Sequence, residues 1–536
     1  MACWVWRVLG AMGHASWVEW WLLGGGALLL FLYWLGTRSH DHFRRRGMPF
    51  ARPLPFVGSM APVLLGRLSM ADWALHLYRA HRHLPASGFF EFARPKLLLR
   101  DPDLIRAVTV KAFDHFVDHQ QFNTERAEPM FARNLLGLTG QEWRDMRATL
   151  SPAFTTSKMR NIFSLINLSA EQMVNYLKKT TKDSPNGVFE VEMKDFSSRL
   201  TNDIIASSAF GIECDSLRQP DNEFYRMGRD LTNIKGLKVL ILFGHILCPK
   251  IMEFFGIRLN SNKVQNFFHN TVHETINERQ KKGIFRPDML QLLMQAREGI
   301  LKAEAGDEPE NIKGAKLKTL SDVDITAQSI IFFFAGFHTV AMTISFCSYA
   351  CAKHPEIQER VQREVDEVFD KCSDKISYDA AQELRYTEMF INEVLRLYLA
   401  VPALDRRCTQ DFTLPAHGGV PAYTVRKGEM VWIPVHPLHV DPEHWEDPHT
   451  FDPERFSDEN KHRIKPFTFI PFGAGPRSCI GSRFALMEVK VVLASILRHF
   501  KFLATDKTPK KLEYATRDFG GGIKGGFWVG IADRRQ

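Results

Sequence analysis

The chain has 536 residues, of which 45% are hydrophobic and 24% charged, and this composition excludes a disordered or fibrous protein. Its formal net charge is +8, but no long basic segment or zinc-finger spacing occurs, so nucleic acid is a weaker candidate partner than anionic lipid or an acidic protein. Eight cysteines are scattered without a CxxC pair, which offers no disulfide framework and fits a reducing compartment.

An uncharged segment near the N-terminus, WWLLGGGALLLFLYWLG at residues 20–36, predicts a membrane-spanning helix with aromatic residues near both ends. Arginines at positions 38 and 44–46 follow it, whereas only Arg7 precedes it, so the body of the protein should face the cytosol. A cleaved signal peptide usually ends in a polar cleavage region, and a mitochondrial presequence is amphipathic, so both alternatives fit less well. We expect an uncleaved anchor over residues 1–37.

Residues 38–59 are basic and rich in proline, which predicts a stiff linker, and residues 60–536 show no repeat and no second linker. Most of this body shows helical amphipathicity, with strand-like alternation at residues 424–435 and 525–531. Residues 306–318 are polar and predict an exposed loop.

Four helices are predicted with particular clarity. Residues 321–354 are apolar enough for a core helix capped by Ser321, and the others are a charged surface helix at 354–369 and helices at 385–400 and 484–500. Residues 236–256 are apolar with sparse charge. They fit a buried helix pair and a surface that dips into lipid equally well.

The segment PFGAGPRSCIGSRFA, residues 471–485, contains the pattern F-x-x-G-x-R-x-C-x-G just before a helix. Gly473 and Gly475 allow the backbone to pass close under a flat ring, and N–H groups near a helix start favour a thiolate. Arg477 is placed to pair with a haem propionate. A thiolate ligand donates electron density to iron and favours cleavage of the O–O bond. We therefore predict that Cys479 is the axial ligand of a haem, in preference to a buried free cysteine.

This loop resembles that of the cytochrome P450 superfamily, and the resemblance extends over roughly residues 45–530. It implies a mainly α fold with smaller β-sheets, in a single catalytic domain that binds iron protoporphyrin IX through a thiolate. The likeness is greatest to the animal microsomal branch, and within it to insect detoxification enzymes and vertebrate relatives of broad specificity.

The resemblance also assigns roles to residues outside the loop. Glu393 and Arg396 are i, i+3 neighbours on one helix face. With Arg455 of FDPERF, they resemble the family's structural triad. Trp143 and Arg147 match a W-x-x-x-R helix that reaches a propionate, and Arg406 is placed like a further propionate contact. The implied cofactor-binding set is Trp143, Arg147, Arg406, Phe472, Gly475 and Arg477.

The segment AGFHT, residues 335–339, resembles the family's oxygen-binding bend in the long apolar helix. Its implied catalytic residue is Thr339, which would orient the water that delivers protons. His338 stands where the family usually has an acid, so it is either a proton relay or a residue without a role. Leu399, Val401 and Leu404 are expected to form an apolar wall of the substrate pocket.

These features predict a monooxygenase that inserts one oxygen atom into small apolar substrates. It should cross the endoplasmic reticulum membrane once, with its catalytic domain facing the cytosol. The chain has no flavin or dinucleotide fingerprint, so electrons should come from a separate NADPH-dependent flavoprotein reductase. Lys461, Arg463 and Lys465 are either docking points for it or a solvated loop. The unusual His338 keeps open a reductase-independent isomerase or dehydratase of peroxides, and a haem-binding protein without turnover is a third possibility.

Overall fold

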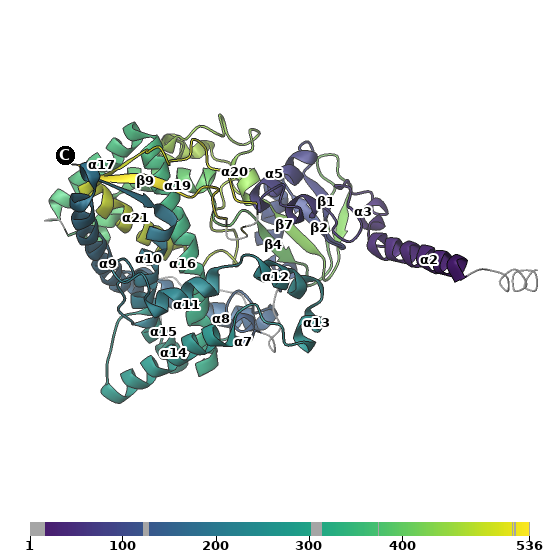
Figure 1. The fold of residues 1–536 in the computed structure, drawn as a ribbon, viewed down its shortest axis with the longest axis horizontal. Coiled ribbons are helices and arrows are strands. Elements are labelled where there is room, and N and C mark those ends of the chain that lie inside the picture. The colour runs from purple at the N-terminus through teal and green to yellow at the C-terminus, as the bar shows by residue number, and fades with distance from the viewer. Residues whose placement is uncertain are drawn as a thin grey trace, which may run out of the picture.

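The computed structural model describes residues 17–121, 128–301, 314–372, 375–516, 518 and 521–534. A large helical body lies on one side, a small β-sheet lies beside it, and helix α2 (Trp17–Thr37) projects outward beyond that sheet (Figure 1). This is the mainly α fold with smaller β-sheets that the sequence predicts.

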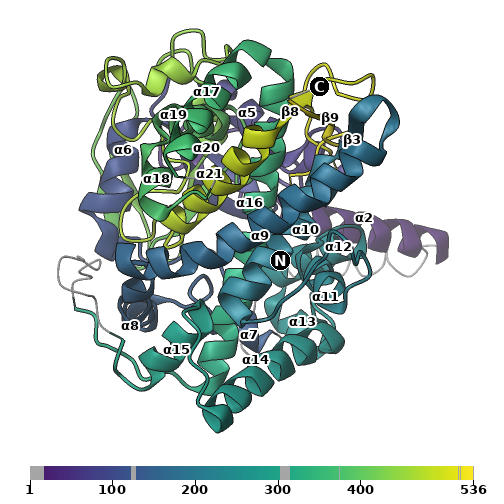
Figure 2. The ribbon, with the colours of Figure 1, turned by 90° about the vertical axis from the view of Figure 1, so that its left-hand side faces the viewer.

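The longer helices of the body are α5 (Met70–Ala80), α8 (Gly140–Leu150), α9 (Thr156–Asp183), α10 (Met193–Ile205), α11 (Glu223–Thr232), α12 (Leu237–Leu247), α14 (Asn262–Lys282), α16 (Asp322–Lys353), α17 (Pro355–Lys371), α19 (Arg385–Leu397) and α21 (Ser482–His499). The shorter ones are α3 (Asp41–Arg44), α4 (Ala61–Leu64), α6 (Pro102–Arg106), α7 (Pro129–Ala132), α13 (Pro249–Phe254), α15 (Met289–Arg297), α18 (Tyr378–Glu383) and α20 (Val435–His439). Helices α9, α10, α16 and α21 pack together in the middle of the body (Figure 2).

Helix α16 is the centre of the hydrophobic core. The predicted cap is confirmed, because the Ser321 side chain accepts from the Asp324 N–H while the Asp324 carboxylate accepts from the Ser321 N–H. Two helices of the described residues are long and apolar enough to cross a membrane. The apolar window of α2 is only 6% buried, whereas that of α16 is 61% buried. We conclude that α16 is a core helix and that α2 has the character of an anchor.

The largest sheet has the order β1 (Ala86–Glu91), β2 (Arg94–Leu99), β7 (Met430–Ile433) and β4 (Leu404–Arg407). Strands β2 and β7 are parallel, and the other neighbours are antiparallel. A second sheet has the order β3 (Val188–Glu192), β9 (Trp528–Asp533) and β8 (Phe500–Leu503), and a third pairs β5 (Phe412–Leu414) with β6 (Tyr423–Val425). The alternating segment 424–435 is divided between β6 and β7, because Gly428 adopts a φ of +91° in the turn between them.

Residues 38–59, predicted as a stiff linker, pack closely against strand β1. Phe43 and Met48 are buried there, and Phe50 forms a bridge with Gly88. Gly58 fits against the Phe90 and Phe92 carbonyls so closely that a Cβ atom would lie within 2.5 Å of both oxygens. Helix α2 therefore joins the body through a segment that is part of the fold.

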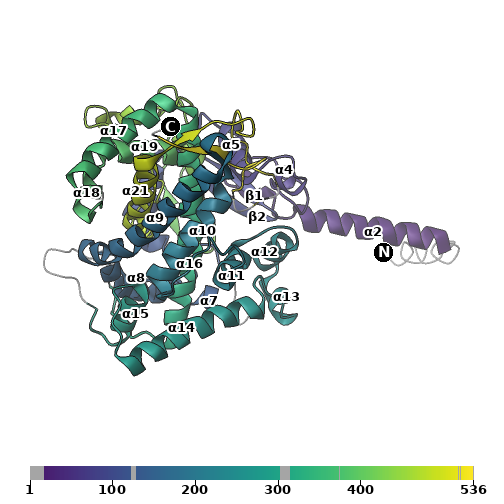
Figure 3. The ribbon, with the colours of Figure 1, turned by 60° about the vertical axis from the view of Figure 1, so that its left-hand side comes forward.

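Residues 236–256, which fit two interpretations from sequence, form α12 and α13 on the surface. Phe243 and Ile246 face the core, but Leu240 is 65% exposed and Phe254 is 83% exposed. Both helices lie on the side of the body from which α2 projects (Figures 1 and 3). The buried-pair interpretation is therefore wrong for the outer face of these helices. The polar segment 306–318 lies largely outside the described residues, and residues 314–318 contain no helix or strand.

Candidate active site

The predicted cysteine loop folds back on itself just before helix α21. The Cys479 N–H donates to the Phe472 carbonyl at 2.8 Å, and the Ser478 N–H donates to the Gly475 carbonyl at 2.8 Å. The Cys479 side chain opens into a cavity of about 360 Å³. Burial raises the pKa of the Cys479 thiol, and the Gly481 N–H and the positive charge of Arg147 oppose this effect.

Gly475 shows why this loop needs glycine. Its φ is +72°, and a Cβ atom added there would lie 1.8 Å from the Thr109 carbonyl oxygen. Thr109 belongs to the π-helical turn η1 (Ala107–Lys111), so the loop is in backbone contact with a segment far away in sequence. Gly481 has no such restriction, because its Cβ position is 3.8 Å from the nearest atom, Phe154 Cε1.

Two predicted cofactor-binding arginines hold the loop by its backbone. Arg147 of helix α8 donates from Nη1 to the Ser478 carbonyl at 2.8 Å. Arg406 of strand β4 donates from Nη2 to the Ala474 carbonyl at 3.3 Å. The loop is therefore fixed on either side by cationic side chains from separate elements.

The third arginine, Arg477, lies inside the protein and donates to three carbonyl oxygens, those of Val117, Leu135 and Leu138, at 2.7–3.1 Å. Its guanidinium lies 4.1 Å from the centre of the buried Trp143 ring. Sequence reasoning placed Trp143 and Arg477 at the cofactor. The structure brings them into contact with each other, and Arg477 also bonds to the backbone near the cysteine loop.

The buried positive charge around the loop fits an anionic cofactor. Burial lowers the pKa of Arg406 to about 10, and burial together with repulsion from Arg406 lowers the pKa of Arg477 to about 9. Neither forms an ion pair with a carboxylate of the described residues, and the buried Nε of Arg406 has no hydrogen-bond partner among them. Asp405 lies close enough to act electrostatically on both arginines but leaves them without an ion pair, and buried cations of this kind beside an apolar cavity and a thiol match the propionates, ring and iron of a haem.

The structure brings the predicted triad together behind the loop. Arg396 donates to both Glu393 carboxylate oxygens at 2.7 and 2.8 Å, and Arg455 Nε lies 3.5 Å from Glu393. Arg396 also donates to the His439 carbonyl at 2.9 Å, while the His439 ring accepts the Ile470 N–H at 2.9 Å. The triad is thus connected by hydrogen bonds to the segment that enters the cysteine loop.

The cavity in front of Cys479 is bounded by helix α16. Ala335, Gly336 and Thr339 line it, together with the three predicted wall residues Leu399, Val401 and Leu404.

Thr339 Oγ1 donates to the Ala335 carbonyl at 2.6 Å, so the hydroxyl bonds back to its own helix one turn earlier. Gly336 also has a packing role, because a Cβ atom there would lie 2.6 Å from Ile205 Cδ1. His338 is half-buried and is not among the residues that line the cavity.

His119 is a cavity residue that sequence reasoning missed. Its Nδ1 lies 3.2 Å from the Asp405 carboxylate, which also accepts the Gln120 N–H. Burial would raise the pKa of Asp405, but the hydrogen bond and charge of His119 lower it to about 2. The only sequence signal was a histidine in a loop, and its partner is nearly three hundred residues away. The cavity also includes Ser208, Met289 and Phe332, which no motif marked.

A sequence model of the cytochrome P450 family matches residues 48–526. The chain is 42% identical to cytochrome P450 9e2 of Blattella germanica over 525 residues, which cover 96% of this chain and 98% of that protein. It is 38% identical to the probable cytochrome P450 9f2 of Drosophila melanogaster over 519 residues, covering 95% and 98%. It is also 37% identical to the probable cytochrome P450 6a13 of the same fly over 492 residues, covering 91% and 94%.

The chain therefore belongs to the cytochrome P450 family. It is a haem-thiolate monooxygenase, an oxidoreductase whose family binds haem through a cysteine thiolate. The predicted resemblance to insect members is confirmed, and the comparisons do not favour the isomerase alternative.

Proposed function

We propose that this protein inserts one oxygen atom from O₂ into small apolar substrates, which would bind in the cavity in front of Cys479. The observation that carries this proposal is the position of Cys479, which opens into a largely apolar cavity that Thr339 also lines. When bound, the haem supplies one-electron and O₂ chemistry to this cavity. Arg147, Arg406 and Arg477 would hold its propionates.

The protein's own residues would then shape the reaction. Leu399, Val401 and Leu404 exclude water from the substrate side. Thr339 would position a proton-donating water at its hydroxyl, which lies at the cavity surface and bonds back to Ala335. His338 does not line the cavity, so its role as a relay would require an intervening group.

The electrons would come from NADPH through a separate flavoprotein reductase. Two points support this: the likeness to the microsomal members of the family, and the lack of a flavin or dinucleotide fingerprint in the sequence. Lys461 and Arg463 are exposed in the 3₁₀ turn Lys461–Arg463 upstream of the cysteine loop. Lys461 contacts Asp458 at 2.5 Å, so part of its charge is neutralised within the chain. With Lys465, these residues remain proposed docking points.

We further propose that α2 crosses the endoplasmic reticulum membrane once, with residues 1–37 as anchor, 38–59 as connecting segment and 60–536 as the catalytic domain on the cytosolic side. The exposed apolar faces of α12 and α13 would enter the same lipid surface. Lipophilic substrates, xenobiotic or endogenous, would then reach the cavity from the bilayer.

The proposed reaction is tested by turnover of the full chain with a fluorogenic alkoxycoumarin as an apolar probe. Product that requires both NADPH and the reductase supports the monooxygenase. Turnover of a lipid hydroperoxide without them, with no coumarin product, would indicate the isomerase, and absence of both reactions would indicate a haem-binding protein.

Two variants test the proton path. Thr339→Ala should lower the ratio of product to NADPH consumed by about ten-fold or more, because proton delivery typically contributes at least that much. His338→Asp restores the acid that the family usually has and should raise the same ratio. An unchanged ratio in His338→Asp would assign no role to this histidine.

A further inference from the structure

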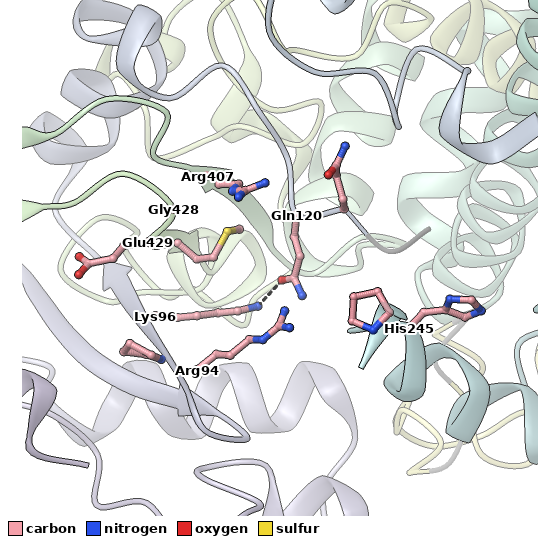
Figure 4. Close-up of a pocket in the computed structure, with 11 residues that line it drawn as sticks. Arg94, Lys96, Gln120, His245, Arg407, Gly428 and Glu429 are labelled. Atoms are coloured by element: carbon pink, nitrogen blue, oxygen red, sulfur yellow. Dashed lines mark hydrogen bonds between the residues drawn. The ribbon is translucent and has the colours of Figure 1, made fainter. Parts of the chain in front are cut away.

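A second pocket of about 480 Å³ lies between the largest sheet and helices α12 and α13, and Cys479 is not among its described lining residues. Its cationic lining residues are Arg94 and Lys96 of β2 and Arg407 of β4, and Gln120 and Gln121 contribute amides. Figure 4 shows the ends of Arg94, Lys96 and Gln120 close together, with Arg407 beyond them on β4, which is separated from β2 by β7. This volume is within the range of small-molecule sites.

The carboxylates near this pocket are already paired. Lys96 is buried and contacts Glu91 at 2.7 Å, and it donates to Gln120 at 2.6 Å. Glu429 is the one carboxylate among the described lining residues, and it binds Arg46 at 2.7 Å. These pairs leave no acidic group for the other two cations.

Arg94 and Arg407 therefore provide positive charge without a counter-ion. Arg94 donates weakly to the Leu247 carbonyl at 3.4 Å, and neither arginine forms an ion pair with any described residue. Both side chains are exposed, so a ligand can reach them. Two such guanidinium groups beside amide donors make a site for a phosphate or a carboxylate.

Apolar surface borders the same pocket. Leu247, whose carbonyl accepts from Arg94, ends helix α12, and Pro249 at the start of α13 lines the pocket. Ile251 of α13 is 54% exposed, and Phe255, which directly follows α13, is 68% exposed. A cationic pocket next to exposed apolar side chains fits an amphiphile with an anionic head and an acyl chain.

We propose that this pocket binds the anionic head group of a membrane lipid, a phosphate or a carboxylate, whose acyl chain lies along the exposed side chains of α12 and α13. The inference deepens the membrane attachment proposed above, because it fixes the sheet as well as α2 at the lipid surface. It also places a lipid beside the active site, since Gln120 lines this pocket and the adjacent His119 lines the cavity of Cys479.

The test uses the full chain, loaded with haem and held in neutral detergent. The protein is incubated with equal amounts of phosphatidylcholine, phosphatidylglycerol and oleic acid, and native mass spectrometry identifies the retained lipids by mass. The variant is Arg94→Gln/Arg407→Gln. The matched control is Lys282→Gln, which removes an exposed cation from the end of α14.

The wild type and the control should retain phosphatidylglycerol or oleate in preference to phosphatidylcholine, and the mass shows whether the head is a phosphate or a carboxylate. The double variant should lose about five-fold in this preference for each arginine removed. An unchanged preference in the double variant, or no preference in the wild type, would overturn the proposal. The reduced carbon monoxide spectrum of the same samples reports the haem site separately, so failure of lipid binding is distinguishable from failure of the proposed activity.

Discussion

Gly475→Ala should prevent the cysteine loop from reaching its native position. The added methyl group would lie 1.8 Å from the Thr109 carbonyl oxygen, so the loop or the turn η1 must move by more than an ångström. The residue also has a φ of +72°, which L-residues with a side chain rarely adopt. Left-handed strain and overpacking together cost about 2–5 kcal/mol, a large part of the stability of a typical domain.

Gly481→Ala is the matched control in the same loop. Its methyl group would have 3.8 Å to the nearest atom, and its φ of −94° suits any residue. Replacing glycine by alanine at this N-cap position should lower the free energy of unfolding by at most about 1 kcal/mol.

Both variants are expressed as full chains, and haem content per protein is compared with the thermal midpoint of unfolding. We expect strong loss of both in Gly475→Ala and near wild-type values in Gly481→Ala. Equal behaviour of the two variants would refute the close-contact reasoning.

Two further substitutions probe buried carboxyl groups. Glu393→Gln should lower the free energy of unfolding by about 3–5 kcal/mol, because Arg396 is then buried without its counter-charge; chemical denaturation measures this, and a loss below about 1 kcal/mol would contradict it. Burial raises the pKa of Glu488 well above its usual range, and its oxygens have no partner among the described residues. Glu488 ionises in the unfolded chain once the pH rises above the ordinary pKa of a glutamate, and this lowers the free energy of unfolding of the wild type. Glu488→Gln should therefore have a higher thermal midpoint than wild type, by a margin that grows from pH 5 to pH 8. A margin that shrinks over this range would argue against a protonated Glu488.

Features that depend on local spacing were predictable from sequence. Three features are of this kind: the Ser321 cap, the i, i+3 pair of Glu393 and Arg396, and the glycine-rich loop before α21. In each of them, the interacting residues are only a few positions apart in the sequence. Local backbone geometry alone determines how these residues lie relative to one another, so the sequence pattern was sufficient to predict the contacts.

Features that depend on long-range packing were not predictable in the same way. The pairing of His119 with Asp405 arises only when the loop after residue 118 meets strand β4. The carbonyl partners of Arg477 come from two segments distant in sequence, at residue 117 and at residues 135–138. The residue type and spacing of Arg477 suggested an anion contact and gave no indication of these backbone bonds. Helix α12 is apolar on both faces, and its periodicity therefore could not show which face is exposed.

The central claim is that the sulfur of Cys479 binds the haem iron. Carbon monoxide difference spectra of the reduced protein should show the red-shifted Soret band of thiolate ligation in the wild type and in Cys372→Ser, which removes another free cysteine. Cys479→His should lose that band while the protein still folds. A wild-type protein that binds haem without the band, or a Cys479→His variant that retains it, would contradict the assignment.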